Sequence, residues 1–129
     1  MTTETTLGLS RIGQIAINVH DLGRATAFYR DVLGMKFLFE VPKMAFFDCG
    51  GVRLMLGLPE TAEFDHPASI IYYRVEDIES AHRTLMARNV PFEAAPHIIA
   101  RMPNYDLWMA FFRDPEGNLL ALMSEVTKN

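Results

Sequence analysis

Residues 12–37 read IGQIAINVHDLGRATAFYRDVLGMKF, and this stretch decides the fold. Its first part alternates between two sets of residues, a period of two that predicts a strand with two different faces. The apolar set is Ile15, Ile17 and Val19, and the other set is Gln14, Ala16 and Asn18. Asp21 then stands where a helix N-cap belongs, because its carboxylate can accept hydrogen bonds from free backbone amides. An apolar stripe at helical spacing follows, and Gly34 can adopt the left-handed conformation that ends a helix.

The same order of parts returns later in the chain. Residues 19–37 and 75–93 both begin Val-x-Asp, followed by Leu or Ile and, three residues further on, by Ala. The segment DCGGVRLML at 48–56 similarly matches DPEGNLLAL at 114–122. The second helix is expected to begin after Asp77 and to end near Asn89, because Pro91 blocks its continuation. The repeat therefore predicts an α+β fold made of two βαβββ modules.

Short β-rich runs follow each predicted helix. They are MKFLFEV, KMAFFDCG and VRLMLGL in the first half, and PFEAA, IIARM, LWMAFFRD and NLLALMSE in the second half. These runs predict a single domain over residues 1–129, with modules at 10–58 and 69–126 joined by a linker at 59–68. Residues 93–107 are expected to be irregular and to form a rim or lid.

Composition limits the functions that the chain can have. Apolar residues make up 50% of its 129 residues, which is enough for a core, and the formal net charge is -4 without any block of like charge. This balance argues against a nucleic-acid or anionic-membrane partner. Cys49 is the only cysteine, so we expect it to pack in a reducing cytoplasm rather than to form a disulfide. The apolar runs are far shorter than the roughly 18 residues that a membrane span needs.

These segments resemble the vicinal oxygen chelate superfamily, which includes glyoxalase I, extradiol dioxygenases, and fosfomycin and bleomycin resistance proteins. The resemblance is carried by residues 12–37, GGVRLMLGL, YYRVEDIESA and FFRDPEGNLLALMSE, and it runs from about Ile12 to Glu125. It implies that the two modules pair their sheets into a half-open barrel whose concave face is the active or binding site. It also implies a homodimer, since family members often pair and sometimes swap modules.

The resemblance further implies where metal-dependent members would place their ligands. Carried over position by position, these places fall on Gln14, Met55, Ile70 and Ala121. Zn²⁺ and similar ions need three or four imidazole, carboxylate or thiolate donors, and only Gln14 among the four could bind a hard cation. We therefore expect no metal cofactor, the alternative being a divalent metal with Gln14 as an atypical ligand. The histidines are expected to be surface or loop residues, namely His20, His66, His82 and His97.

Strand alternation predicts which side chains line the concave face, called the cup below. The strand candidates for ligand binding are Gln14, Asn18, Arg53, Met55, Ile70, Tyr72, Arg74 and Ala121, and Trp108 is a further candidate because it lies beside the predicted lid. Apolar walls with a few polar groups are typical of a small-molecule site. Arg53 and Arg74 could bind an anion or pair with nearby acids. Trp108 could stack on a flat ligand or pack in the core, and Tyr72 could donate a hydrogen bond.

Hypotheses from different functional classes follow. The favoured one is a metal-independent protein of the bleomycin resistance type that binds a flat or amphipathic organic molecule. The alternative is a metal-dependent lyase, isomerase or dioxygenase that acts on a vicinal-oxygen substrate. A third hypothesis is a structural or regulatory subunit whose cavity is filled by its own side chains. No catalytic residue is predicted, since the sequence has no nucleophile elbow, glycine-rich phosphate loop or dinucleotide fingerprint.

Overall fold

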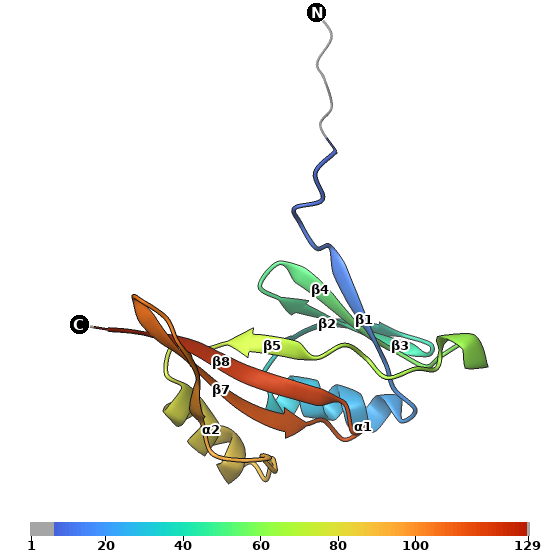
Figure 1. Ribbon diagram of the computed structural model, residues 1–129. Coiled ribbons are helices and arrows are strands. Elements are labelled where there is room, and N and C mark those ends of the chain that lie inside the picture. Colours follow the sequence, from blue (N-terminus) through green and yellow to red (C-terminus); the bar gives the residue numbers. More distant parts are fainter. Residues whose placement is uncertain (1–6, 129) are drawn as a thin grey trace, which may run out of the picture.

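The computed structural model describes residues 7–128 and arranges them as two βαβββ modules (Figure 1). The first module runs β1 (Gln14–Asn18), α1 (Leu22–Ala27), the π-helical turn η1 (Phe28–Val32), β2 (Lys36–Val41), β3 (Met44–Cys49) and β4 (Val52–Gly57). The second runs β5 (Ile71–Arg74), α2 (Ile78–Ala87), β6 (His97–Arg101), β7 (Tyr105–Arg113) and β8 (Leu119–Thr127). The predicted α+β class and the repeated order of elements are confirmed.

Each module forms one four-stranded mixed sheet. The strand order is β1-β4-β3-β2 in the first sheet and β5-β8-β7-β6 in the second. The opening strand of each module lies parallel to its closing strand, with Gln14 opposite Arg53 in one sheet and Tyr72 opposite Ala121 in the other. The two sheets do not close into a barrel within residues 7–128, which leaves the half-open arrangement that the family resemblance implies.

Both helices begin at the aspartates that the sequence pattern predicts. Oδ1 of Asp21 accepts the backbone N–H of Arg24 at 3.0 Å, and Oδ1 of Asp77 accepts that of Ser80 at 3.0 Å. These bonds satisfy amides that have no partner within the helix. After the first helix, Gly34 has a φ of 72°, a left-handed conformation that costs glycine little.

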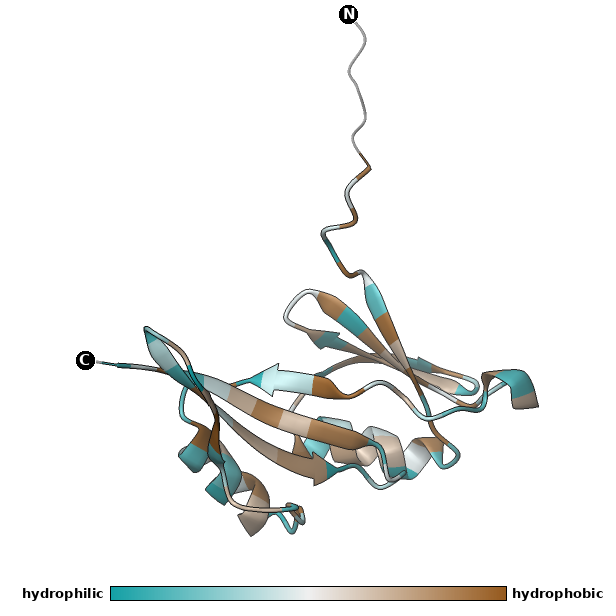
Figure 2. Ribbon diagram, in the orientation of Figure 1, coloured by the Kyte–Doolittle hydropathy of each residue, from teal (hydrophilic) through white to brown (hydrophobic). Residues whose placement is uncertain are grey.

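The core joins the two modules on the helix side of their sheets. Ile17 and Phe47 from the first module and Phe112 and Leu120 from the second are fully buried members of one continuous cluster. Hydrophobic and hydrophilic segments alternate along β1 and β4 (Figure 2), so one face of this sheet joins the core and the other remains outside. The two sheets therefore share their helix-facing sides, and their other sides are called the outer faces here.

A buried hydrogen bond ties the modules together at the second copy of the repeated turn. The Tyr29 hydroxyl donates to Oδ2 of Asp114 at 2.8 Å, while Oδ1 of Asp114 accepts the backbone N–H groups of Glu116 and Asn118, both at 2.9 Å. In the first copy of the turn, Oδ1 of Asp48 accepts the N–H of Gly51 at 3.0 Å. The repeated aspartate therefore stabilises a turn in both modules, and only the second one also gains a partner from α1–η1.

The second module departs from two sequence-based predictions. Residues 93–107 are not irregular throughout, because they contain β6, which the β-rich run IIARM predicts and whose residues alternate in exposure and pair antiparallel with β7. The predicted strand PFEAA is also wrong, since it makes only an isolated bridge between Phe92 and Phe112. No helix within residues 7–128 combines the length and the apolarity that crossing a membrane would take.

Candidate functional site

Three of the predicted cup residues meet on the outer face of the first sheet. Nε of Arg53 donates to Oε1 of Gln14 at 2.8 Å, and Nε2 of Gln14 lies 3.9 Å from Sδ of Met55. The guanidinium carbon of Arg53 lies 5.4 Å from the centroid of the Phe46 ring, and that ring stacks on Phe39 at 4.6 Å between centroids. This outer face therefore offers a cationic group beside a flat aromatic surface. Sequence reasoning missed Phe46, although its alternation in β3 with the buried Ala45 and Phe47 carries the signal.

Asn18 lies on the same outer face, but its amide already has partners. Its Nδ2 donates to the backbone carbonyls of Phe64 and His66, which lie between β4 and β5. A cavity of about 180 Å³ lies beside it and is lined by Met44, Met55 and Phe64 among others. Asn18 therefore holds the connecting segment against the sheet, and this segment borders the outer face.

The outer face of the second sheet is mainly apolar. The Tyr72 and Phe111 rings meet edge to face, with 6.1 Å between centroids. Ala121 lies between them in the sheet register and is fully buried, so its small side chain leaves room for the two rings to converge above it. Ile70 precedes β5 and is exposed. Ile70 and Tyr72 can therefore contact a ligand, whereas Ala121 lies beneath the surface.

Arg74 ends β5 and has an acidic partner on β8. Its Nη2 lies 3.3 Å from Oε1 of Glu125. The Arg74 side chain is 67% exposed, and such surface pairs contribute little to stability. Of the two alternatives for Arg74, pairing with an acid is thus the one present in the structure.

Trp108 lies on the helix side of the second sheet rather than on its outer face. It pairs in register with Ser124, and it packs against the shared core. It also borders a cavity with Ile78 at the start of α2. Because it is three residues before Phe111 on one strand, it has the opposite orientation. Of the two alternatives for Trp108, stacking on a ligand in the cup and packing in the core, its position favours packing in the core.

The two outer faces remain separate surfaces in a single chain. Within residues 7–128, Tyr72 lines a cavity with Ile15 and Leu54 of the first module, and Gln14 does not line it. The physical reason is the shared core: since both sheets use their helix-facing sides to pack together, their outer faces are not directed into a common space. The sequence pattern assigned residues to faces but did not determine how the modules pack.

The residues at the four family metal positions do not fit a divalent cation. Oε1 of Gln14 is the only hard donor among these four residues. It already accepts a hydrogen bond from the Arg53 guanidinium, which places a positive charge where the ion would bind. Met55 offers a thioether, while Ile70 and Ala121 offer no donor. In the part of the chain that the structure describes, no three His, Cys, Asp or Glu side chains gather closely enough to hold a metal ion.

His20 connects both modules and the segment between them, a role that its sequence context did not reveal. Its Nε2 lies 2.9 Å from Oδ1 of Asp65, and its Nδ1 lies 3.2 Å from Oε1 of Glu116. The hydrogen bond to Asp65 and the negative charges of both acids raise the pKa of His20. Burial raises the pKa of Glu116, but hydrogen bonds from the backbone amides of Asp21 and His20 outweigh it and lower that pKa overall.

Comparison with known proteins agrees with this geometry. Residues 11–122 match the family model of the Glyoxalase/Bleomycin resistance protein/Dioxygenase superfamily, and the chain belongs to this superfamily. The predicted family is thereby confirmed.

Solved structures share the fold. The chain is similar to a lactoylglutathione lyase from Agrobacterium tumefaciens, with 28% identity, coverage of 89% of this chain and 93% of that one, and a TM-score of 0.72. It is similar to a glyoxalase/bleomycin resistance protein/dioxygenase from Alicyclobacillus acidocaldarius, with 22% identity, coverage of 89% and 91%, and a TM-score of 0.71. A virulence protein from Salmonella typhimurium shares the fold at 16% identity, with coverage of 93% and 100% and a TM-score of 0.77.

Proposed function

We propose that this protein is a cytoplasmic, metal-independent binding protein for a flat or amphipathic organic anion. The observation that carries the proposal is the hydrogen bond from Arg53 to Gln14, because it puts a fixed cation at the place where metal-dependent relatives would need an anionic or neutral donor set. Met55, Ile70 and Ala121 supply no hard donor around it. A site of this kind attracts an anionic ligand directly instead of through a metal.

The surroundings of Arg53 favour a ligand with a flat body. A guanidinium has five N–H donors, and the Gln14 carbonyl takes one of them at 2.8 Å. The remaining donors can form a charge-assisted pair with a carboxylate, sulfonate or phosphate. The stacked Phe46 and Phe39 rings and the Met55 thioether then offer an apolar surface beside that pair.

The complete cup is proposed to form between two copies of the chain. In such a dimer, the outer face of the first sheet of one chain would lie opposite the outer face of the second sheet of the other chain. Arg53 of one chain and Tyr72 of the other would then line one cavity. Exposed apolar side chains support this arrangement, because Phe39 is 45%, Ile70 41% and Tyr72 43% exposed in the single chain. Sedimentation over a range of concentrations should show a dimer, and a monomer at every concentration would contradict this part of the proposal.

The metal independence is tested with 8-anilinonaphthalene-1-sulfonate, a flat aromatic anion whose fluorescence reports binding. Protein dialysed against a chelator should keep the affinity and the melting temperature of untreated protein, and adding Zn²⁺ or Ni²⁺ should change neither. Arg53→Gln should weaken the binding of the probe. Arg83→Gln removes an equal charge from the exposed face of α2 and should leave that binding unchanged. A loss of affinity on chelation that is restored by metal would end the proposal.

The enzyme alternative rests on one finding, the 28% identity with a lactoylglutathione lyase over most of both chains. Under this alternative, Gln14 would be an atypical metal ligand and the chain would act on lactoylglutathione or a related vicinal-oxygen compound. Purified protein should then contain close to one transition metal ion per chain by elemental analysis. It should also form or cleave lactoylglutathione, and Gln14→Ala should lose metal and activity together. If the protein contains no transition metal and does not act on lactoylglutathione, the proposed binding function remains.

A further inference from the structure

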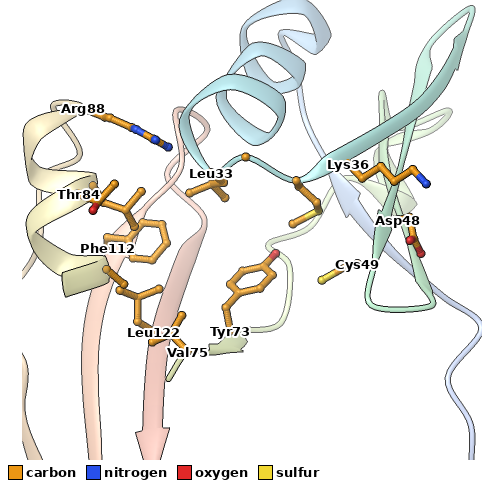
Figure 3. A pocket seen from close by; sticks show the side chains of 14 residues that line it. Leu33, Lys36, Asp48, Cys49, Tyr73, Val75, Thr84, Arg88, Phe112 and Leu122 are labelled. Carbon is orange, nitrogen blue, oxygen red and sulfur yellow. The ribbon is translucent and has the colours of Figure 1, made fainter. Parts of the chain in front are cut away.

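A cavity of about 440 Å³ lies between the modules on the helix side, away from both outer faces (Figure 3). The first module contributes Leu33 and Met35 to its wall, and the second contributes Leu85, Phe112 and Leu122. Its volume lies within the roughly 300–1,000 Å³ range of small-molecule sites. An apolar cavity of this size between two modules is large enough to hold an organic ligand.

The Tyr73 side chain enters this cavity with an unused hydroxyl group. Figure 3 shows its ring reaching between Leu33 and Cys49. The hydroxyl oxygen is buried and has no hydrogen-bond partner among residues 7–128. Tyr29, the other tyrosine buried near the module junction, has Asp114 as its partner at 2.8 Å. Because a buried hydroxyl without a partner is unfavourable, a ligand oxygen placed beside Tyr73 would remove that cost.

Charged residues lie around this apolar interior. Lys36 and Arg88 line the cavity from different modules and appear on either side of Tyr73 in Figure 3. Nη1 of Arg88 donates to the Val32 carbonyl at 2.7 Å, which fixes the guanidinium and leaves its other N–H groups available. Lys36 and Asp48 lie in register with Arg53 and Gln14 of the outer face, so Arg88 is the cation that the second module places at the helix side of this cavity.

Cys49 belongs to the lining as a neutral group. Burial, together with the charge of Asp48, raises the pKa of its thiol. A thiol with a raised pKa is a weak nucleophile, so Cys49 contributes contact surface rather than covalent chemistry.

We propose that this cavity is a second ligand site, separate from the cup, for a small apolar carboxylic acid that carries a carbonyl oxygen on its body. The carboxylate stays beside the exposed guanidinium of Arg88, because burying an unpaired charge is unfavourable. The carbonyl oxygen accepts a hydrogen bond from Tyr73, and the hydrocarbon body packs against Leu85 and Phe112.

Three related probes separate these contributions. The first is 4-acetylbenzoate, which has both oxygen functions; 4-ethylbenzoate lacks the carbonyl, and acetophenone lacks the carboxylate. In an NMR titration, 4-acetylbenzoate should bind roughly three- to tenfold more tightly than 4-ethylbenzoate. Tyr73→Phe should bring this ratio close to one, whereas Tyr105→Phe at the start of β7, outside the cavity lining, should leave it unchanged. Arg88→Gln should weaken the binding of both benzoates and leave the binding of acetophenone unaffected.

Methionine methyl groups locate the bound probe. Met35 lines this cavity and Met55 lies on the outer face of the first sheet, so intermolecular NOEs to the Met35 methyl are expected. The proposal is overturned by NOEs to Met55 alone, by an affinity ratio that survives Tyr73→Phe, or by no binding at millimolar probe. Tyr73→Phe removes a hydroxyl without a partner and should fold as the parent does, which keeps the comparison valid.

Discussion

The substitution Tyr29→Phe removes one oxygen atom from the junction between the modules. That oxygen donates the 2.8 Å hydrogen bond to Oδ2 of Asp114, a carboxylate that is 5% exposed. After the substitution, Oδ2 keeps only the donor from Nδ2 of Asn118 at 3.0 Å. The aromatic ring remains in the core, so the change tests the hydrogen bond and little else.

The expected magnitude follows from the charge and burial of the acceptor. A hydrogen bond to a charged group contributes about 1.5–3 kcal/mol, and its loss leaves a buried carboxylate oxygen with one partner fewer. We therefore expect Tyr29→Phe to lower the unfolding free energy by about 2 kcal/mol. For a chain of this length, about 4 °C of melting temperature corresponds to each kcal/mol, so the melting temperature should fall by about 8 °C.

Urea denaturation at constant m-value measures this change, and Tyr73→Phe is the matched control. Both hydroxyls are buried near the junction, but that of Tyr73 has no partner within residues 7–128. Its removal should change the unfolding free energy by less than about 0.5 kcal/mol or raise it slightly. Equal losses in the two variants, or a Tyr29→Phe variant as stable as the parent, would refute the reasoning.

Three further changes follow from the fold. Because its pKa is raised in the folded chain, His20 contributes stability that is complete below its ordinary pKa of 6.5 and is lost as the pH rises through the folded value. His20→Asn should reduce the fall in unfolding free energy between pH 6 and pH 9, measured by urea denaturation. An unchanged dependence of that free energy on pH would contradict the role given to His20. Asp77→Ala should cost about 1 kcal/mol by removing the cap of α2, with Asp77→Asn nearly neutral in the same denaturation assay. Gly34→Ala should cost about 1–2 kcal/mol of stability because the φ of Gly34 is 72°. Gly13→Ala is the control, since Gly13 has open space around it and no such φ, and it should leave the melting temperature almost unchanged. Equal losses of stability in the two variants would refute this account.

The elements of the fold could be predicted because their signals are local. Alternation in residues 14–19, the caps at Asp21 and Asp77, and the left-handed residues at Gly34 and Asn89 each act within a few positions of the chain. The stretch at 93–107 was harder, since it was expected to be irregular although it contains the β-rich run IIARM, and pairing with β7 makes part of it the strand β6. Tertiary pairing therefore decided what local composition left open.

For the candidate site, the sequence predicts only which residues of each sheet share the face away from the helices. Alternation grouped Gln14 with Arg53 and Met55, which lie together in the structure, and Ile70 with Tyr72, which are both exposed. It did not predict that Asn18 would hold the segment after β4, because that contact joins residues far apart in the sequence. Nor could it predict how the modules pack, which depends on a few contacts between them.

Those contacts explain how a chain can keep the fold of this superfamily while Met55, Ile70 and Ala121 stand at positions that the resemblance assigns to metal ligands. The hydrogen bonds between the modules lie on the helix side or at the β7–β8 turn, and they include those of Tyr29 with Asp114, His20 with Glu116 and Arg88 with the Val32 carbonyl. Gln14, Met55 and Ile70 take no part in them. Donors at these positions can therefore be exchanged for aliphatic and thioether groups without disturbing the module junction, so the same packing supports either an ion-binding surface or the Arg53-centred surface found here.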